Sequence, residues 1–306
     1  IGFRINTVLI PGLFINTELE FSGLTRFRTD IFYPTRSMDF PVYPILLFGY
    51  QDIPRDVYNI EGEKILRYDE RGWYVGGGLG ISPTRFLNFE GKVNLQYPDI
   101  YLDIGDIEEE FRRIRDKILA FIAEVDFDLL DNVLVPRRGL KVAARLEMSF
   151  KQVGSSFDYG RLTSLFDFYY TISKLHTFRL NSRYLHSWKA DPFYKTIFFI
   201  GGPHIFYGLE YSQGLGTKFF ILRFDYRYEV IPNLFVKGIV NTSPYYELGL
   251  PGTEHKGAAL WGYGFGFMYD SILGPVELQF AWGDKTPYDP GKKVSRIYFT
   301  AGYKLW

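Results

Sequence analysis

The sequence contains no cysteine among its 306 residues, which excludes disulfide bonds and thiolate chemistry. It carries no net charge, because 35 basic residues balance 35 acidic ones, so its charge gives no reason to expect a nucleic acid partner. No apolar run approaches the roughly 20 residues that a membrane-spanning helix requires, which excludes a helical membrane protein. The chain starts at Ile1 without a basic-then-apolar leader, so either a signal peptide has been removed or the chain is a fragment, and we expect a C-terminal fragment of a longer protein.

Aromatic residues, in contrast, are abundant. The chain has 24 Tyr and 29 Phe, and 19% of its residues are aromatic, yet its mean hydropathy is slightly negative. A soluble protein of this composition would have to bury its rings in a large core, and its sequence would show long apolar runs or helical stripes. Neither pattern covers most of the chain.

Strict alternation of apolar and polar residues is the dominant pattern. Between residues 140 and 150 the even positions are apolar and most odd positions are charged, notably Lys141, Arg145 and Glu147. Successive side chains of a strand point to opposite faces of its sheet, so this segment predicts a strand with one apolar and one polar face. The same alternation recurs in 177–188, 217–229, 258–270 and 275–283.

A soluble sheet with one wet face would also alternate in this way. Three features favour a membrane barrel instead: the length of the strands, their number, and aromatic residues near strand ends, namely Trp188, Trp261, Trp282 and Trp306. Only a closed barrel leaves no unpaired strand edge in lipid. We therefore predict an all-β fold, a transmembrane antiparallel β-barrel of about sixteen strands formed by residues 1–306, in contact with the lipid bilayer of the bacterial outer membrane.

The predicted strands can be placed by their turn signals. They span 2–10, 13–22, 24–34, 40–51, 57–69, 72–82, 86–97, 118–130, 138–150, 158–172, 175–188, 217–229, 234–242, 258–270, 275–283 and 294–306. Two insertions interrupt them. Residues 106–118 have acids first, bases next and an apolar stripe, which predicts a solvated helix, or less favourably a partner-binding one. Residues 189–216 form a loop too long for a tight turn, and such loops are usually functional.

Two segments resemble a known family. The stretch DLLDNVLVPRRG, with Asp128, Asp131, Asn132, Pro136 and Gly139, is similar to the periplasmic strand end and turn of the BamA/TamA-type outer-membrane barrel superfamily, which includes two-partner secretion transporters. The final segment RIYFTAGYKLW, with Gly302, Tyr303 and Trp306, resembles the C-terminal signal read by the barrel assembly machinery. The resemblance implies that this machinery is a partner during biogenesis.

The long loop matches the family with one departure. Gly201 and Gly202 match a Gly-Gly pair and Gly208 a glycine at the loop tip, and the resemblance implies a loop folded into the barrel lumen. Tyr207 stands where the family has Arg, so the loop itself cannot form a bidentate guanidinium–carboxylate lock. This argues against the insertase and two-partner branches and suits the patatin-like (type Vd) autotransporters.

Lumen charges are expected on one face of the strand at 217–229: Arg223, Asp225, Arg227 and Glu229. These charges could coordinate a substrate, but internal ion pairing around a plugging loop is favoured. In that pairing, Asp225 and Glu229 would be neutralised by Arg223 and Arg227.

Catalysis is not expected. His186 and Ser187 are the one His–Ser pair, and adjacent strand residues point to opposite faces. No residue spacing indicates a metal or cofactor site. The favoured function is a non-enzymatic barrel that anchors and helps export a covalently linked passenger N-terminal to Ile1, as in type V secretion. The alternative is a BamA/TamA-type insertase or a two-partner secretion transporter, and a passive porin is less favoured.

Overall fold

The chain folds almost entirely into β-structure. The computed structural model describes residues 2–10, 13–21, 25–32, 42–58, 64–104, 113–132, 135–173, 175–189, 193–248, 255–256, 259–271, 274–287 and 289–302. Within these ranges, 15 long strands form one antiparallel sheet. No helix in these ranges is long and apolar enough to cross a membrane.

The strands follow one another along the chain. The long strands are β1 (Gly2–Ile10), β2 (Leu13–Phe21), β3 (Thr25–Phe32), β4 (Val42–Tyr58), β5 (Lys64–Thr84), β6 (Leu87–Ile104), β8 (Ile118–Asp128), β9 (Gly139–Ser149), β10 (Tyr159–Ile172), β11 (His176–Trp188), β13 (Gly214–Ile231), β14 (Leu234–Leu248), β16 (Leu260–Ser271), β17 (Gly274–Thr286) and β18 (Asp289–Ala301). Short elements are β7 (Arg113–Arg115), β12 (Phe198–Ile200), β15 (His255–Lys256), the 3₁₀ turn Lys151–Val153, and the helices α1 (Phe193–Thr196) and α2 (Gly202–Ile205).

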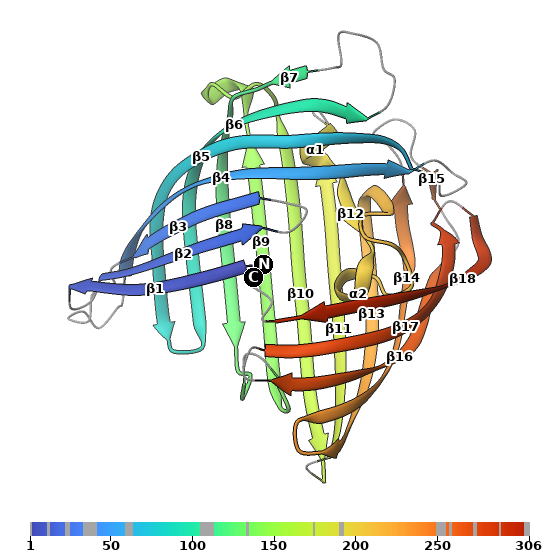
Figure 1. Cartoon of the computed structure of the whole chain (residues 1–306). Helices are drawn as coiled ribbons and strands as arrows, with labels where there is room; N and C mark the ends of the chain where they lie inside the picture. The colour runs from blue at the N-terminus through green and yellow to red at the C-terminus, as the bar shows by residue number, and fades with distance from the viewer. Residues whose placement is uncertain are drawn as a thin grey trace.

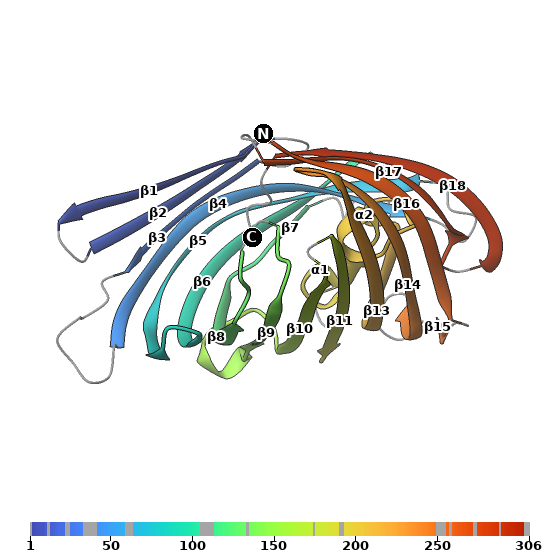
Figure 2. The same ribbon diagram turned by 90° about the horizontal axis from the view of Figure 1, so that it is seen from below.

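The long strands form an up-and-down meander, in which each pairs with its neighbours in sequence. The sheet curves strongly, and α1 and α2 lie on its concave side (Figures 1 and 2). Because the number of long strands is odd, β1 and β18 run in the same direction. No ladder joins β1 to β18 among the described residues, so the predicted barrel fold is confirmed with an open seam at this point.

The two faces of the sheet have opposite polarity, as the alternation predicts. On β10, Phe168 and Tyr170 are 42% and 53% exposed on the convex face, while Asp167 between Phe166 and Phe168 is buried on the concave face. Arg223 and Asp225 on β13 are likewise buried inside. A soluble sheet would bury its rings and expose its charges, so this inversion is the pattern of a barrel with a lipid-facing exterior and a polar lumen.

The prediction of two strands at 57–69 and 72–82 was wrong. Residues 64–69 and the whole of 72–82 belong to the single strand β5, and residues 57 and 58 end β4. The charged residues between them do not turn the chain, because they have cross-strand partners: Gln51 donates to Glu70 over 2.9 Å, and Arg71 forms a 2.8 Å ion pair with Asp52. One strand in place of two reduces about sixteen predicted strands to the 15 observed.

The predicted helix at 106–118 is also corrected. Residues 106–112 lie outside the described ranges, and Arg113–Arg115 form β7, which pairs antiparallel with β6. Arg113 donates to Asp99 of β6 over 2.8 Å. An acid-then-base pattern suits the first and last turns of a helix, but the bases here meet an acid on a neighbouring strand instead.

Candidate functional site: the lumen loop and its seat

The segment between β11 and β13 crosses the concave side of the sheet. We use the name lumen loop for its described residues, 193–213. Near its start, Lys195 donates to Gln96 of β6 over 2.8 Å, and the Phe199 ring lies 4.9 Å from the guanidinium carbon of Arg55 on β4. The loop therefore leaves β11 and contacts the opposite wall, β4 to β6, before it returns to β13.

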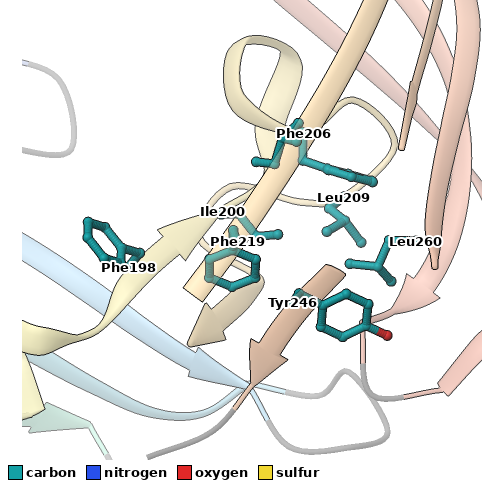
Figure 3. Close-up of a cluster of buried hydrophobic side chains, with 8 residues drawn as sticks. Phe198, Ile200, Phe206, Leu209, Phe219, Tyr246 and Leu260 are labelled. Carbon is teal, nitrogen blue, oxygen red and sulfur yellow. The ribbon is translucent and has the colours of Figure 1, made fainter. Parts of the chain in front are cut away.

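Apolar side chains hold the middle of the lumen loop against the wall formed by β13, β14 and β16. Figure 3 shows the cluster, to which the loop contributes Phe198, Ile200, Phe206 and Leu209, and the strands contribute Phe219, Ile221, Tyr246 and Leu260. All eight are buried. This cluster is an apolar core on the lumen face of the wall, and it fixes the loop in place.

The predicted glycines provide the backbone conformation of the loop. Gly201, Gly202 and Gly208 have φ values of 134°, 81° and 98°, which side chains other than glycine rarely adopt. The amide of Gly202 donates to the carbonyl oxygen of Leu209 over 2.9 Å, so the segment closes on itself. The tip formed by Tyr207 and Gly208 lies between these ends.

Tyr207 is fully buried at the loop tip. Its amide donates to Oδ1 of Asn241 on β14 over 2.9 Å. Its hydroxyl donates to the carbonyl oxygen of Phe280 on β17 over 3.0 Å, and that of Phe265 on β16 lies at 3.3 Å. The phenol therefore replaces an ion pair with hydrogen bonds to the main chain of the barrel wall.

Glycines on β16 and β17 form the seat of the tip. A Cβ atom at Gly262 would overlap the carbonyl of Tyr207, and one at Gly264 would lie 2.8 Å from its ring. A Cβ atom at Gly283 would lie 2.5 Å from the carbonyl oxygen of Gly208. Two of the alternating glycines of 258–270, Gly262 and Gly264, are therefore explained by the close approach of the loop to the wall.

The last strand holds the tip with two side chains that the sequence analysis did not single out. The hydroxyl of Tyr298 accepts from the amide of Gly208 over 3.1 Å and donates to the carbonyl oxygen of Leu209 over 2.7 Å. Arg296 donates to the carbonyl oxygen of Gly208 and to Oε1 of Gln213, the latter over 3.1 Å. The alternation of RIYFTAGY places Arg296 and Tyr298 on the lumen face, and this pattern could have identified them from the sequence.

Of the predicted lumen charges, Arg223 and Asp225 lie beside the loop. Arg223 Nε donates to Asp225 over 2.7 Å, and its Nη1 donates to the carbonyl oxygen of Pro203 over 2.6 Å. Its guanidinium carbon lies 5.8 Å from the centre of the Tyr207 ring. Asp225 has a second cation, Arg179 of β11, at 3.1 Å.

Glu229 and Arg227 do not pair with each other as expected, and each contacts the turn between β8 and β9. Glu229 forms a 2.6 Å ion pair with Arg137, and Arg227 donates to the carbonyl oxygen of Pro136 over 2.5 Å. Both partners belong to the turn between β8 and β9. Val135 of this turn is buried against Phe235 and Met268, which lie on the lumen face of β14 and β16. The turn therefore folds into the other end of the lumen.

The predicted turn motif is ordered by its own side chains. Asp131 Oδ1 accepts from the amides of Arg137 and Arg138, over 2.9 and 3.1 Å. Asn132 accepts from the amide of Val135 over 3.1 Å, and Asp128 accepts from the amide of Leu130 over 2.9 Å. Gly139 begins β9 at a φ of 118°. These contacts explain why short acids and an amide occur at this spacing.

Of the three residues predicted for the C-terminal assembly signal, Gly302 alone is described. Its amide donates to the carbonyl oxygen of Pro275 over 3.1 Å, while Tyr303 and Trp306 lie outside the described residues. No group of His, Asp or Glu within the described part of the chain could hold a metal ion.

The comparison with protein families decides the identity. The model of the Omp85 superfamily domain matches residues 65–305. This chain belongs to the Omp85 superfamily. Omp85 barrels are outer-membrane proteins, so the predicted superfamily and membrane are supported, whereas the patatin-like subtype is not. A search of curated proteins returned no match.

Solved structures support the Omp85 fold. BamA from Haemophilus ducreyi lacking POTRA domains 1–3 superposes with a TM-score of 0.72 at 12% identity, over 94% of this chain and 64% of that one. CdiB from Acinetobacter baumannii gives 0.57 at 12% identity, over 94% of this chain and 53% of that one. CdiB from Escherichia coli gives 0.56 at 13% identity, over 93% and 55%. The chain thus spans about half to two thirds of these structures.

Proposed function

We propose that this Omp85 barrel acts on polypeptides at the bacterial outer membrane as a BamA-type insertase. The observation that carries the proposal is the path of the lumen loop, which contacts Gln96 on one wall and Tyr298 on the other. A barrel whose lumen is crossed by its own loop is a poor route for passive solutes, so its function is sought in the handling of protein chains. The higher TM-score with BamA, 0.72 against 0.57 with CdiB from Acinetobacter baumannii, favours the insertase branch.

Tyr207 in place of the family's arginine spoke against the insertase branch, but other arginines contact the loop in the structure. The loop tip has no arginine of its own, but Arg296 of β18 donates to the carbonyl oxygen of Gly208. Arg223 of β13 donates to the carbonyl oxygen of Pro203. Guanidinium groups therefore do hold the loop, and they come from the strands. Export of an attached passenger remains a prediction, and the comparisons with BamA and CdiB give it no support.

The test is an insertion assay with the purified barrel in phosphatidylethanolamine/phosphatidylglycerol liposomes. A urea-unfolded eight-stranded outer-membrane protein is added, and its folding is followed by heat-modifiable gel mobility. The proposal expects faster client folding with this barrel than with liposomes that contain an equal amount of a porin. Equal rates in the two preparations would exclude the insertase function.

A second part of the experiment tests whether the lumen loop controls client folding, or whether any barrel in the membrane has the same effect. Gly262→Ala disturbs the seat of the tip, whereas nothing lies within 4 Å of a Cβ atom at Gly238 on the adjacent strand. If the lumen loop controls insertion, Gly262→Ala will change the client folding rate and Gly238→Ala will not.

A further inference from the structure

A groove of about 530 Å³ lies on the convex, lipid-facing side of the wall. It is lined by β5, β6, β8 and β9, which are neighbours in the sheet (Figure 1). One cross-strand row through it consists of Leu79, Gly91, Ala123 and Leu146. The outer two residues of this row are large and the central two are small. The middle of the row is therefore a depression, and Leu79 and Val93, which are 59% and 41% exposed, stand beside it.

The side chains around the depression are apolar. The adjacent row on the same face consists of Gly77, Val93, Phe121 and Met148. Lys92 lies between the two rows, but its side chain points into the lumen, where its Nζ lies 2.7 Å from a carboxylate oxygen of Glu90. The groove therefore presents hydrocarbon and thioether groups to the bilayer.

The packing of the protein itself does not require glycine at positions 77 and 91. A Cβ atom at Gly91 would meet nothing within 4 Å, and one at Gly77 would make ordinary contacts at 3.5 Å. Neither glycine has a positive φ. Glycine weakens the interior of a strand and often marks a place where a ligand approaches closely. In contrast to Gly262, these two glycines make room on the outside of the barrel.

The groove lies about halfway across the bilayer. Trp73 and Tyr97 pair across β5 and β6, and both are exposed aromatic residues of the kind that marks a membrane interface. Arg85 is exposed in the turn that joins the other ends of these strands. The twelve residues from Trp73 to Arg85, at roughly 3.3 Å each and a tilt of about 40°, cover about 30 Å, which is the hydrocarbon thickness. Leu79 is midway between them.

Arg85 lies at the depth of the lipid phosphates. Its guanidinium carbon is 4.4 Å from the centre of the Phe86 ring, and no ion pair joins it to an acid within the described ranges. The turn between β8 and β9 is at the same end of the barrel, because the amide of Asp128 donates to the carbonyl oxygen of Phe86 over 2.8 Å. The family resemblance places that turn in the periplasm. Arg85 therefore faces the periplasmic leaflet, whose lipids are phospholipids.

We propose that the groove holds one acyl chain of a phospholipid from the periplasmic leaflet, with the phosphate of that lipid at Arg85. Water is absent at the depth of the groove, so hydrocarbon fills a depression there. A chain over Gly91 contacts the main chain beneath it and the side chains of Leu79 and Leu146 beside it, whereas a chain on a flat wall has contacts on one side only. Dispersion contacts are individually weak and collectively large, so this chain is held longer than its neighbours.

The headgroup adds a second contact. A guanidinium donates strong, charge-assisted hydrogen bonds to phosphate oxygens. The site combines this contact with the groove, and it does not depend on the proposed insertase function.

The experiment reconstitutes the folded full chain into phosphatidylglycerol liposomes, extracts it in mild detergent and measures retained lipid by native mass spectrometry. The wild type should retain a single phosphatidylglycerol molecule. Gly91→Leu fills the depression and should lower the retained fraction about tenfold, because many dispersion contacts are lost together. Gly238→Leu is the matched control, since Gly238 lies outside the groove beside the exposed Phe265 and has open space around its Cβ position. It should leave retention unchanged.

A second measurement tests the headgroup contact. Diacylglycerol with the same chains lacks the phosphate, and the wild type should retain it less than phosphatidylglycerol. Arg85→Gln should remove this difference, whereas Arg115→Gln, at a side chain that is 67% exposed on β7, should preserve it. Equal retention of the two lipids by the wild type would overturn the assignment of the phosphate to Arg85.

Equal retention of phosphatidylglycerol by the wild type and Gly91→Leu would overturn the groove as the binding site. If Gly91→Leu does not fold, Gly91→Val replaces it, and undiminished retention by that variant has the same meaning. Mixed liposomes with lipopolysaccharide test the source of the lipid. Retention of lipopolysaccharide in place of phosphatidylglycerol, or of a second copy of the chain without lipid, would show that the occupant is not a phospholipid.

Discussion

Gly262 of β16 lies directly against the main-chain carbonyl of Tyr207, so closely that a methyl group at position 262 would overlap the oxygen. The absence of a side chain on the wall is therefore as important to the loop as the ring of Tyr207. Close packing of this kind is sensitive to a single added carbon atom.

Gly262→Ala should lower the free energy of unfolding by about 1–3 kcal/mol, because an overpacked contact displaces the loop or the strand. Urea titration of the folded barrel in detergent measures this loss, and limited proteolysis reports whether the loop becomes accessible. Gly238→Ala is the control, because a Cβ atom there meets nothing within 4 Å. Equal effects of the two substitutions would show that the tip does not occupy this seat.

Tyr207→Arg should not stabilise the barrel, although it restores the residue typical of the family. Arg223 already lies 5.8 Å from the ring, and the nearby Asp225 is bound by both Arg223 and Arg179. The new guanidinium would meet a like charge and no free acid, at a cost of about 1–3 kcal/mol including the lost hydroxyl bonds. A gain of several kcal/mol in the urea titration would reveal an unpaired lumen acid.

Exchange of the side chains at positions 207 and 223 also tests whether Asp225 is available to an arginine at the loop tip. In the double variant Tyr207→Arg with Arg223→Tyr, Asp225 loses one of its two cations and becomes available to the new arginine. The double variant should therefore be more stable than Tyr207→Arg alone, which a double-mutant cycle measures. Strict additivity would indicate that position 207 does not communicate with Asp225.

Leu146→Arg tests which face of β9 meets lipid. An arginine on the lipid face near the bilayer midplane costs about 2–4 kcal/mol. Ala143→Arg is on the lumen face of the same strand and lines a cavity of about 470 Å³ between β6, β8, β9, β10 and β11. It should cost less, because the cavity is wide enough for the side chain. Refolding into liposomes with a urea titration gives both values, and the reverse order would invert the assignment of the two faces.

Val135→Asp should release the turn between β8 and β9 from the lumen. Val135 is buried with Phe235 and Met268, and an unpaired carboxylate in that cluster is strongly unfavourable. Because the turn folds into one end of the lumen, its release should raise ion conductance in planar bilayers. Val153→Asp, at a residue that is 47% exposed, is the control. Unchanged conductance with an intact barrel would show that the turn does not obstruct the lumen.

Much of the fold follows from alternation alone, since period two fixes which side chains of β9 to β18 face lipid. Charged residues whose partners are distant in sequence were predicted wrongly. Glu70 and Arg71 resemble a break between strands until Gln51 and Asp52 are placed beside them. Arg113 fits a helix until Asp99 is opposite. In both places the deciding contact joins different strands.

In the candidate site, too, contacts between residues distant in sequence could not be predicted. The glycines at 201, 202 and 208 could be recognised because their spacing matches a family pattern. The seat at Gly262, Gly264 and Gly283 could not, since a glycine on an alternating strand gives no sign of what approaches it. Arg137 was likewise missed as the partner of Glu229, because 92 residues separate them along the chain.

The glycine seat also has a consequence for the order in which the protein folds. The lumen face of β16 has no side chain at Gly262 and Gly264, so its packing there is completed by the lumen loop, which precedes β16 in the chain. The bonds from Tyr207 to Phe280 and from Gly208 to Tyr298 span 73 and 90 residues. Contacts of such long sequence separation form late, after the entropy of closing large loops has been overcome. The packing of the C-terminal wall around the loop tip is therefore complete only once the lumen loop has docked.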